Sequence, residues 1–256
     1  MIRTLVLIAV TGFFLSVGCI AASFAIAGGP FAITDHGIVH ARDFHIHGPD
    51  DRTLRGRGEL VLDPNPGPRV TRGFAWSGGD RLVVDVPADV VFTQGPLAKL
   101  TISGPKEILD KLIVGAGSIR VDSEEDLNDD YRLKIIMTAP DIQKFELNGD
   151  QNMVIEGYNQ PMLGLDITGS GEASVKGAAK SVKLSIAGSG RADLAEVAVD
   201  DAVIDVSGSG HAKLGPKGTV KVDISGSGDV ELTVKPTSLE SEISGSGRVS
   251  QPGIPG

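Results

Sequence analysis

Apolar and polar residues alternate through the second half of the chain, around a Gly-Ser-Gly triplet that recurs. Apolar positions lie four and two residues before the first glycine of a triplet, and four and six residues after it. They are Phe145, Leu147, Met153, Ile155, Leu165, Ile167, Ala173, Val175, Leu184, Ile186, Ala192, Leu194, Ile204, Val206, Ala212, Leu214, Val222, Ile224, Val230, Leu232, Ile243 and Val249. Apolar spacing of two is typical of a β-strand with one buried face. Because the spacing continues past the glycines, each repeat is predicted to be a strand, a sharp corner and a second strand.

The triplets start at Gly169, Gly188, Gly208, Gly226 and Gly245, after a degenerate copy, Gly149-Asp150-Gln151. The interval between successive copies is nearly constant, and a fixed period of this kind indicates stacked repeats. A β-meander and a parallel β-helix could both use such units. Similar residues at equal offsets favour the β-helix, because like positions then stack about 4.8 Å apart. We therefore predict an all-β fold, a single-stranded parallel β-helix (solenoid) of 18–20-residue Gly-Ser-Gly coils.

The glycines are expected at the corners because a tight corner needs a positive φ or a close approach to the neighbouring coil. The serines between them would stack in a column. This column could be a polar strip that binds a ligand or a structural ladder, and the ladder is the favoured interpretation.

Two segments of the sequence resemble a known family. They are TAPDIQKFELNG with the LDITGSGEASVKG-type units that follow it, and the earlier GGDRLVVDVPADVVFTQGPLAKLTISGPKEILDKLIV. Both are similar to the head GIN domain family of auto-transporter adhesins, over roughly Arg72 to Val249. The resemblance implies a parallel β-helix in exported bacterial proteins of largely unknown role, without catalytic residues to carry over. No membrane barrel is expected after the repeats, so the auto-transporter part of the family's name finds no support in these residues.

The N-terminal segment, residues 1–27, is expected to direct export. An almost wholly apolar run from Leu5 to Ala27 follows Arg3. It could be a signal peptide cut after Ala27, or a membrane anchor, which needs about 20 apolar residues. It could also be a lipoprotein signal acylated at Cys19, although Ser16 stands where such signals carry a leucine-like residue. All three interpretations place the rest of the protein outside the cytoplasm, in the periplasm or cell envelope.

The expected organisation has four parts. Residues 1–27 are a signal peptide or anchor, 28–69 a proline-rich linker, 70–250 the β-helix domain with regular coils over 139–250, and 251–256 a tail. Cys19 is the sole cysteine, so the exported part has no disulfide framework. The chain carries 24 Lys+Arg against 33 Asp+Glu, a net charge of −9. Without clustered basic residues, nucleic-acid binding is not expected.

Two stretches have the composition of metal sites. Four histidines, His36, His40, His45 and His47, fall in the linker with Asp35 and Asp43, but their spacing matches no standard motif. An acidic run contains Glu124, Glu125, Asp126, Asp129 and Asp130, without the glycine and carboxylate spacing of a calcium loop. A solvated linker and a solvated loop are the favoured interpretations, so no metal, cofactor or catalytic residue is assigned.

Val70 to Val121 is predicted to be a β-rich lead-in. Strands are expected around residues 82–86, 90–94 and 100–102, with a short helix in Lys106–Leu112 and a strand at Leu133–Thr138. Phe74 and Trp76 are expected to pack where the lead-in meets the first coil. At the other end, Ser241 and Gln251 replace apolar residues, so the last coil is expected to lose its inward face.

These features favour a non-catalytic exported cell-envelope protein, an adhesin-like binding or scaffolding module. Its partner would be an envelope component, a glycan or a protein, and the membrane if residues 1–27 stay uncleaved. The alternatives are a polysaccharide-active or polysaccharide-binding β-helix, whose groove would be lined by Glu172, Arg191, His211 and Asp229, and an envelope-sensing ectodomain. If residues 1–27 stay uncleaved, Met1–Thr4 would leave almost no cytoplasmic tail for signalling, which counts against the sensor.

Overall fold

A computed structural model describes residues 69–122 and 131–253. The predicted signal or anchor, the histidine tract and the acidic residues Glu124–Asp130 lie outside these ranges. The strands are β1 (Arg69–Phe74), β2 (Arg81–Asp85), β3 (Ala88–Gln94), β4 (Lys99–Pro105), β5 (Leu112–Gly115), β6 (Ser118–Val121), β7 (Leu133–Ala139), β8 (Lys144–Gly149), β9 (Asn152–Gly169), β10 (Glu172–Gly188), β11 (Arg191–Gly208), β12 (His211–Pro216), β13 (Thr219–Gly226), β14 (Asp229–Leu232), β15 (Ser238–Gly245) and β16 (Arg248–Ser250). One helix, α2 (Lys106–Asp110), is among the described elements.

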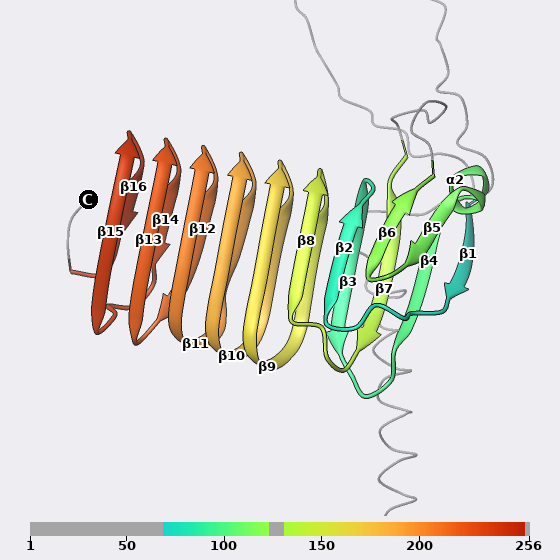
Figure 1. The fold of residues 1–256 in the computed structure, drawn as a ribbon, viewed down its shortest axis with the longest axis horizontal. Helices are drawn as coiled ribbons and strands as arrows, with labels where there is room; N and C mark the ends of the chain where they lie inside the picture. Colours follow the sequence, from blue (N-terminus) through green and yellow to red (C-terminus); the bar gives the residue numbers. More distant parts are fainter. Residues whose placement is uncertain (1–68, 123–130, 254–256) are drawn as a thin grey trace, which may run out of the picture. The chain divides into compact units, whose positions relative to one another are not determined.

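The C-terminal half is a parallel solenoid, as predicted (Figure 1). β9, β10 and β11 are 18, 17 and 18 residues long, so each makes nearly a full turn. β10 pairs in parallel with both neighbours, and Gly169, Gly188 and Gly208 fall in one register. Each later turn is built from two shorter strands. β12 and β13 form one turn, β14 and β15 form the next, and β16 begins the last.

The Gly-Ser-Gly corners form the column that the sequence predicts; we call it the Gly-Ser-Gly edge. The first glycine has a positive φ, 115° at Gly208, and a Cβ there would lie 2.6 Å from the carbonyl oxygen of Gly188. Each serine N–H donates to that glycine's carbonyl one coil earlier, as from Ser209 to Gly188 at 2.8 Å. The serine side chains are exposed. The backbone therefore makes the ladder, and the hydroxyls face solvent.

Each coil has three sides. In β11 the alternation of buried and exposed residues breaks at residues 195–196 and again at 200–201. Inward residues thus come from three stretches, 192–194, 197–199 and 202–206. We call the middle stretch and its equivalents in other coils the short side, and the break before it the variable corner. The core is aliphatic, apart from the edge-to-face contacts that join Phe92, Phe145 and Tyr158.

The lead-in is β-rich, as predicted, and it also extends the solenoid. β2 pairs in parallel with β8, and β3 pairs in parallel with β9, so β2 and β3 form a coil below the first repeat. β6 and β7 pair in parallel with the opposite edges of β2 and β3. The chain therefore builds β2–β3, then β6–β7 on its outer side, and returns to place β8 on its inner side. This order of stacking differs from the order along the chain (Figure 1).

At the corner of the β2–β3 coil, Val86-Pro87-Ala88 aligns with Gly149-Asp150-Gln151, so both glycines of the triplet are missing there. The buried Gln151 compensates for this change. Its Nε2 donates to the carbonyl of Val86 at 3.0 Å and to that of Asn148 at 2.8 Å. In later coils a backbone N–H of the corner satisfies the equivalent carbonyl. Gln151 therefore replaces the third glycine of the triplet where the column begins.

The N-terminal end of the stack is covered by antiparallel strands β1, β4 and β5 and by α2, whose Ile108 and Leu109 are buried. The prediction for Phe74 and Trp76 was wrong. Phe74 pairs with Leu100 on the outermost strands, away from the first repeat, and Trp76 lies against the Gly117 turn between β5 and β6. That hairpin was not predicted, because its short strands carry no sustained alternation.

The C-terminal end is open, as the loss of apolar residues predicts. Among the strands of residues 69–122 and 131–253, β15 pairs only with β13, and β16 only with β14. Ser241 is exposed, and Ile243 is 43% exposed. Among the described residues, no helix is long and apolar enough to cross a membrane.

Candidate binding groove

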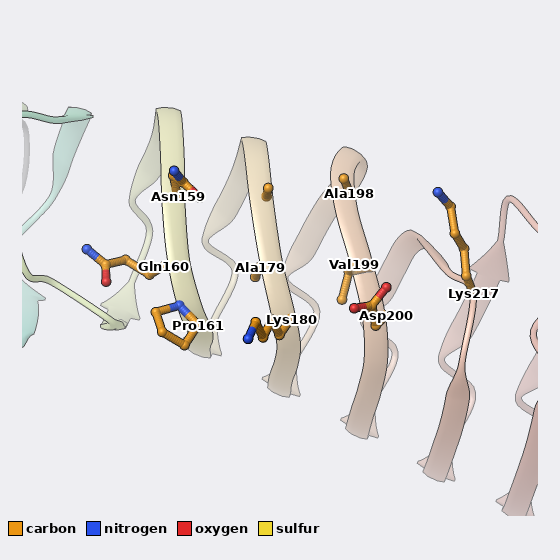
Figure 2. Close-up of a pocket in the computed structure, with 10 residues that line it drawn as sticks. Asn159, Gln160, Pro161, Ala179, Lys180, Ala198, Val199, Asp200 and Lys217 are labelled. Carbon is orange, nitrogen blue, oxygen red and sulfur yellow. The ribbon is translucent and has the colours of Figure 1, made fainter.

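A hollow of 420 Å³ runs over the short sides of four successive coils (Figure 2). It is lined by Asn159, Gln160, Pro161, Ala178, Ala179, Lys180, Ala198, Val199, Asp200 and Lys217. Three of these coils contribute the same three positions each, and the fourth contributes only Lys217. The hollow is therefore a groove across the coils, and we call it the short-side groove.

Unequal coil lengths are absorbed at the variable corner. Between β9 and β10 the register shifts between Val175 and Gly177. Between β10 and β11 it shifts between Ser174 and Lys176, because β11 has one residue more there. The Gly-Ser-Gly edge keeps its register in both pairs. Differences in length thus reshape the short side and leave the opposite edge unchanged.

The coil that begins with β12 is shorter, and it ends the groove. Leu194 pairs with Leu214 and Val199 with Pro216, so β12 reaches the short side with fewer residues than β11. Only Lys217 extends over the groove from this coil. Its N–H donates to the carbonyl of Val199 at 3.2 Å, which holds Lys217 beside the preceding coil.

The groove has a floor of small residues and a charged rim. Ala178 and Ala198 contribute small side chains to the lining on two neighbouring coils. Ala179 and Val199, the next residues along the chain, are nearly buried. Lys180, Asp200 and Lys217 stand on successive coils and are exposed (Figure 2). None of the ion pairs among residues 69–122 and 131–253 involves these three. Their charges face solvent and are free to meet a partner.

Amide hydrogen bonds hold the N-terminal end of the groove. The side chain of Gln94 bonds the backbone of Asn159 twice, accepting from its N–H at 2.7 Å and donating to its carbonyl at 3.2 Å. Gln94 and Gln160 both donate to the carbonyl of Pro140, at 3.2 and 2.7 Å. Pro140 lies in the connection from β7 to β8. The groove and that connection are thus fixed together.

The predicted outward row forms after the Gly-Ser-Gly edge, away from the short-side groove. Glu172, Arg191, His211 and Asp229 fall in one register just after the Gly-Ser-Gly edge, and none of them lines the groove. They stand in single file, so their side chains do not converge on one point. In the next row Lys213 pairs with Glu231 at 3.0 Å, an ion pair between successive coils.

Glu146 is the least exposed charged group in the described ion pairs, and it lies outside the short-side groove. Glu146, 13% exposed, bonds Arg81 of the preceding coil and Lys144, and Lys144 also pairs with Asp166 at 3.0 Å. Burial by itself raises the pKa of Glu146, but the hydrogen bonds from Arg81 and Lys144 outweigh it and lower that pKa below its usual value. This network joins three coils, and it is a stabilising feature.

Within the described residues, no group of three or more His, Cys, Asp or Glu side chains is placed to hold a metal ion. The histidine tract, for which a solvated linker is the favoured interpretation, lies outside those residues. Sequence reasoning missed every residue of the groove. The available signal was the unequal spacing of the triplets, since Gly208 to Gly226 is a shorter step than Gly188 to Gly208. Unequal steps show that some part of the coil changes shape.

The family described as "Putative auto-transporter adhesin, head GIN domain" matches residues 80–255. The chain belongs to this family. The resemblance found in the sequence is thereby confirmed, and the relationship is with adhesin-like proteins. No curated protein matches the chain.

A solved structure shares the fold of this head GIN protein. A "putative adhesin" from Bacteroides fragilis is 18% identical, with a TM-score of 0.58 over 71% of this chain and 96% of that one. A "putative adhesin" from Parabacteroides merdae is 14% identical, with a TM-score of 0.46 over 72% and 95%. A "putative lipid binding protein" from Parabacteroides distasonis is 16% identical, with a TM-score of 0.43 over 72% and 96%. At 18% identity, the likeness to the Bacteroides fragilis structure shows the fold alone.

Proposed function

We propose that this protein is a non-catalytic, adhesin-like binding module of the cell envelope and that the short-side groove is its recognition surface. The observation that carries the proposal is the groove itself: it crosses four coils, has a floor of small residues and carries unpaired charges on its rim. A surface that runs along a solenoid suits an extended partner. Membership of an adhesin-like family supports the same conclusion.

Export is part of this proposal. The apolar run at residues 5–27 would carry the domain out of the cytoplasm, either as a signal or as an anchor. The non-catalytic part rests on geometry. An enzyme needs groups within hydrogen-bond reach of one reacting centre, whereas the candidate row Glu172, Arg191, His211 and Asp229 is spread over four coils.

The test is to fill the groove. Ala198 is exposed over the hollow, so Ala198→Trp would occupy it without a change in the core. Val203, 49% exposed on another side of the same coil, offers the matched control Val203→Trp. The full chain, purified in mild detergent, would be applied to arrays of bacterial polysaccharides and of extended peptides.

We expect Ala198→Trp to abolish the array binding of the wild-type protein and Val203→Trp to leave it unchanged. Equal binding by the two variants would overturn the assignment of the groove. Release of soluble sugar fragments from any array polysaccharide by the wild-type protein would overturn the non-catalytic assignment.

A further inference from the structure

We propose that the short-side groove selects an unbranched anionic polysaccharide in which a carboxylate-bearing sugar alternates with an uncharged one. This inference rests on the proposed function and names the partner class for the same groove. The observation behind it is the order of charges along the rim, which is Lys180, Asp200 and Lys217 on successive coils. The order is positive, negative, positive.

The register sets the spacing of these charges. Ala179 pairs with Val199 and Ser181 with Asp201, which places Lys180 directly beside Asp200 on the next coil. Lys217 lies one coil further, next to Asp200, because Gly218 donates to the carbonyl of Asp200 at 2.7 Å. Neighbouring strands lie about 4.8 Å apart, so the two lysines are about 10 Å apart along the stack.

A polysaccharide matches this spacing better than a β-strand does. In an extended polysaccharide, each pyranose ring adds a length close to the spacing between neighbouring coils. Each sugar would therefore lie over one coil. Side chains on one face of an extended peptide recur about every 6.8 Å, which fits neither one coil step nor two. A sugar chain in the groove therefore places its first and third rings at the two lysines.

The charges then decide which sugars fit. Carboxylates on the first and third rings would meet the ammonium groups of Lys180 and Lys217 in charge-assisted hydrogen bonds. The ring between them would offer hydroxyl or amide donors to the carboxylate of Asp200. A carboxylate on that middle ring would face Asp200, and like charges at this distance repel. Asp200 therefore selects against polymers in which every sugar is acidic.

The composition of the groove supports electrostatic recognition. Its lining contains no aromatic side chain on which a neutral sugar ring could stack. Exposed ion pairs each contribute little to binding, and they weaken further with added salt. We therefore expect modest affinity that falls as ionic strength rises.

The probe is a hyaluronan oligosaccharide, whose uronates alternate with an uncharged amino sugar. The comparison ligands are oligogalacturonate, carboxyl-reduced hyaluronan and an acidic peptide of similar length. The full chain in mild detergent should bind hyaluronan at least about fivefold more tightly than each of the other three. Equal or tighter binding of oligogalacturonate or of the carboxyl-reduced polymer would overturn the alternating-charge inference.

Charge variants place the effect on the groove. Lys180→Glu with Lys217→Glu should reduce hyaluronan binding by at least about fivefold. Lys183→Glu with Lys221→Glu is the matched control, because these exposed lysines also lie two coils apart in one row, on another side. Circular dichroism of the two double variants checks that both are folded. Equal loss of binding in both would overturn the inference.

Asp200→Asn tests selectivity separately from affinity. It removes the repelling carboxylate, so oligogalacturonate should bind several-fold better while hyaluronan changes little. If oligogalacturonate binding does not improve, Asp200 has no selective role. If only the acidic peptide binds, and Ala198→Trp abolishes that binding, the polysaccharide inference fails while the proposed function stands.

Discussion

The Gly-Ser-Gly edge and the variable corner lie on the same coils and differ in what they allow. Along the edge every corner has the same length, the same positive φ at its first glycine and the same backbone hydrogen bond to the coil before. At the variable corner the register shifts between β9, β10 and β11, and the groove lies beside it. One edge keeps the coils in register, which leaves the opposite side free to vary.

Deleting one residue from each region should separate them most strongly. Deletion of Ser209 would remove the corner N–H that bonds Gly188 and shift the following strands by one residue, which turns inward residues outward. We expect a loss of at least about 4 kcal/mol, or no folding at all. Deletion of Ala195 would give β11 the corner length of β10. It should lower the free energy of unfolding by about 1 kcal/mol, because the hydrogen bond from the Ala195 N–H to Asp193 is lost.

Urea denaturation followed by circular dichroism measures both deletions. Ser209→Ala is the control, because the hydroxyl is exposed and only the backbone at this position is needed. It should unfold at the wild-type midpoint. Equal costs for the two deletions would show that the edge and the corner tolerate length changes alike.

A matched pair of glycine substitutions is expected to have the next largest effect. Gly208 has a φ of 115° and a crowded Cβ position, whereas Gly157, at the variable corner, has a φ of 64° and nothing within 4 Å of its Cβ position. Gly208→Ala should cost about 3 kcal/mol or more, from backbone strain and the clash together. Gly157→Ala should cost about 1 kcal/mol, from strain alone. Similar urea midpoints for the two variants would contradict the crowded-edge geometry.

The network at Glu146 should show a smaller, pH-dependent effect. The folded pKa of Glu146 lies below its unfolded value of about 4.3, so its stabilisation is complete above that pH and disappears as the pH falls through the folded pKa. Glu146→Gln should cost about 1 kcal/mol at pH 7, because both cationic partners are about half exposed. Thermal unfolding from pH 7 to pH 3 should show the difference shrinking below about pH 4.3. A difference that stays constant down to pH 3 would contradict this assignment.

Asp205 should matter least. It is exposed on the outer face of β11, in the same row as Asp223 of the next coil. Asp205→Ala should change stability by no more than about 0.5 kcal/mol, and relief of repulsion from Asp223 favours a slight gain. The urea midpoint measures this change. A loss as large as that of Gly208→Ala would mean that outward side chains hold the coils together.

Local patterns were sufficient to predict the repeated part of the fold. The spacing of two marked Leu184, Ile186 and Ala192 as inward residues, and all three are buried. The glycines marked the corners, because a residue such as Gly208 has no alternative at that φ and that crowding. These features depend on residues close by in the chain and on the equivalent residues of the next repeat. Both sets of residues can be read directly from the sequence.

The candidate site could not be predicted in the same way. Lys180, Asp200 and Lys217 stand in one row only because coils of different length realign after the variable corner. The step along the chain from Lys180 to Asp200 is longer than the step from Asp200 to Lys217, so no single period connects the three. Gln151 likewise resembles a degenerate glycine until the carbonyl of Val86 is found beside it.

By itself, the sequence determined the coil, its corners and its inward face, because alternation and glycine geometry act over a few residues. Only the tertiary structure decided that β2 lies between β6 and β8, that β3 lies between β7 and β9, and that the short sides enclose a groove. These arrangements depend on which strand edges remain unpaired when segments distant in the chain meet. The sequence does not specify this, because backbone N–H and C=O groups form the same hydrogen bonds whatever the side chains are. The residues of the proposed binding groove are therefore ones that the repeats do not share.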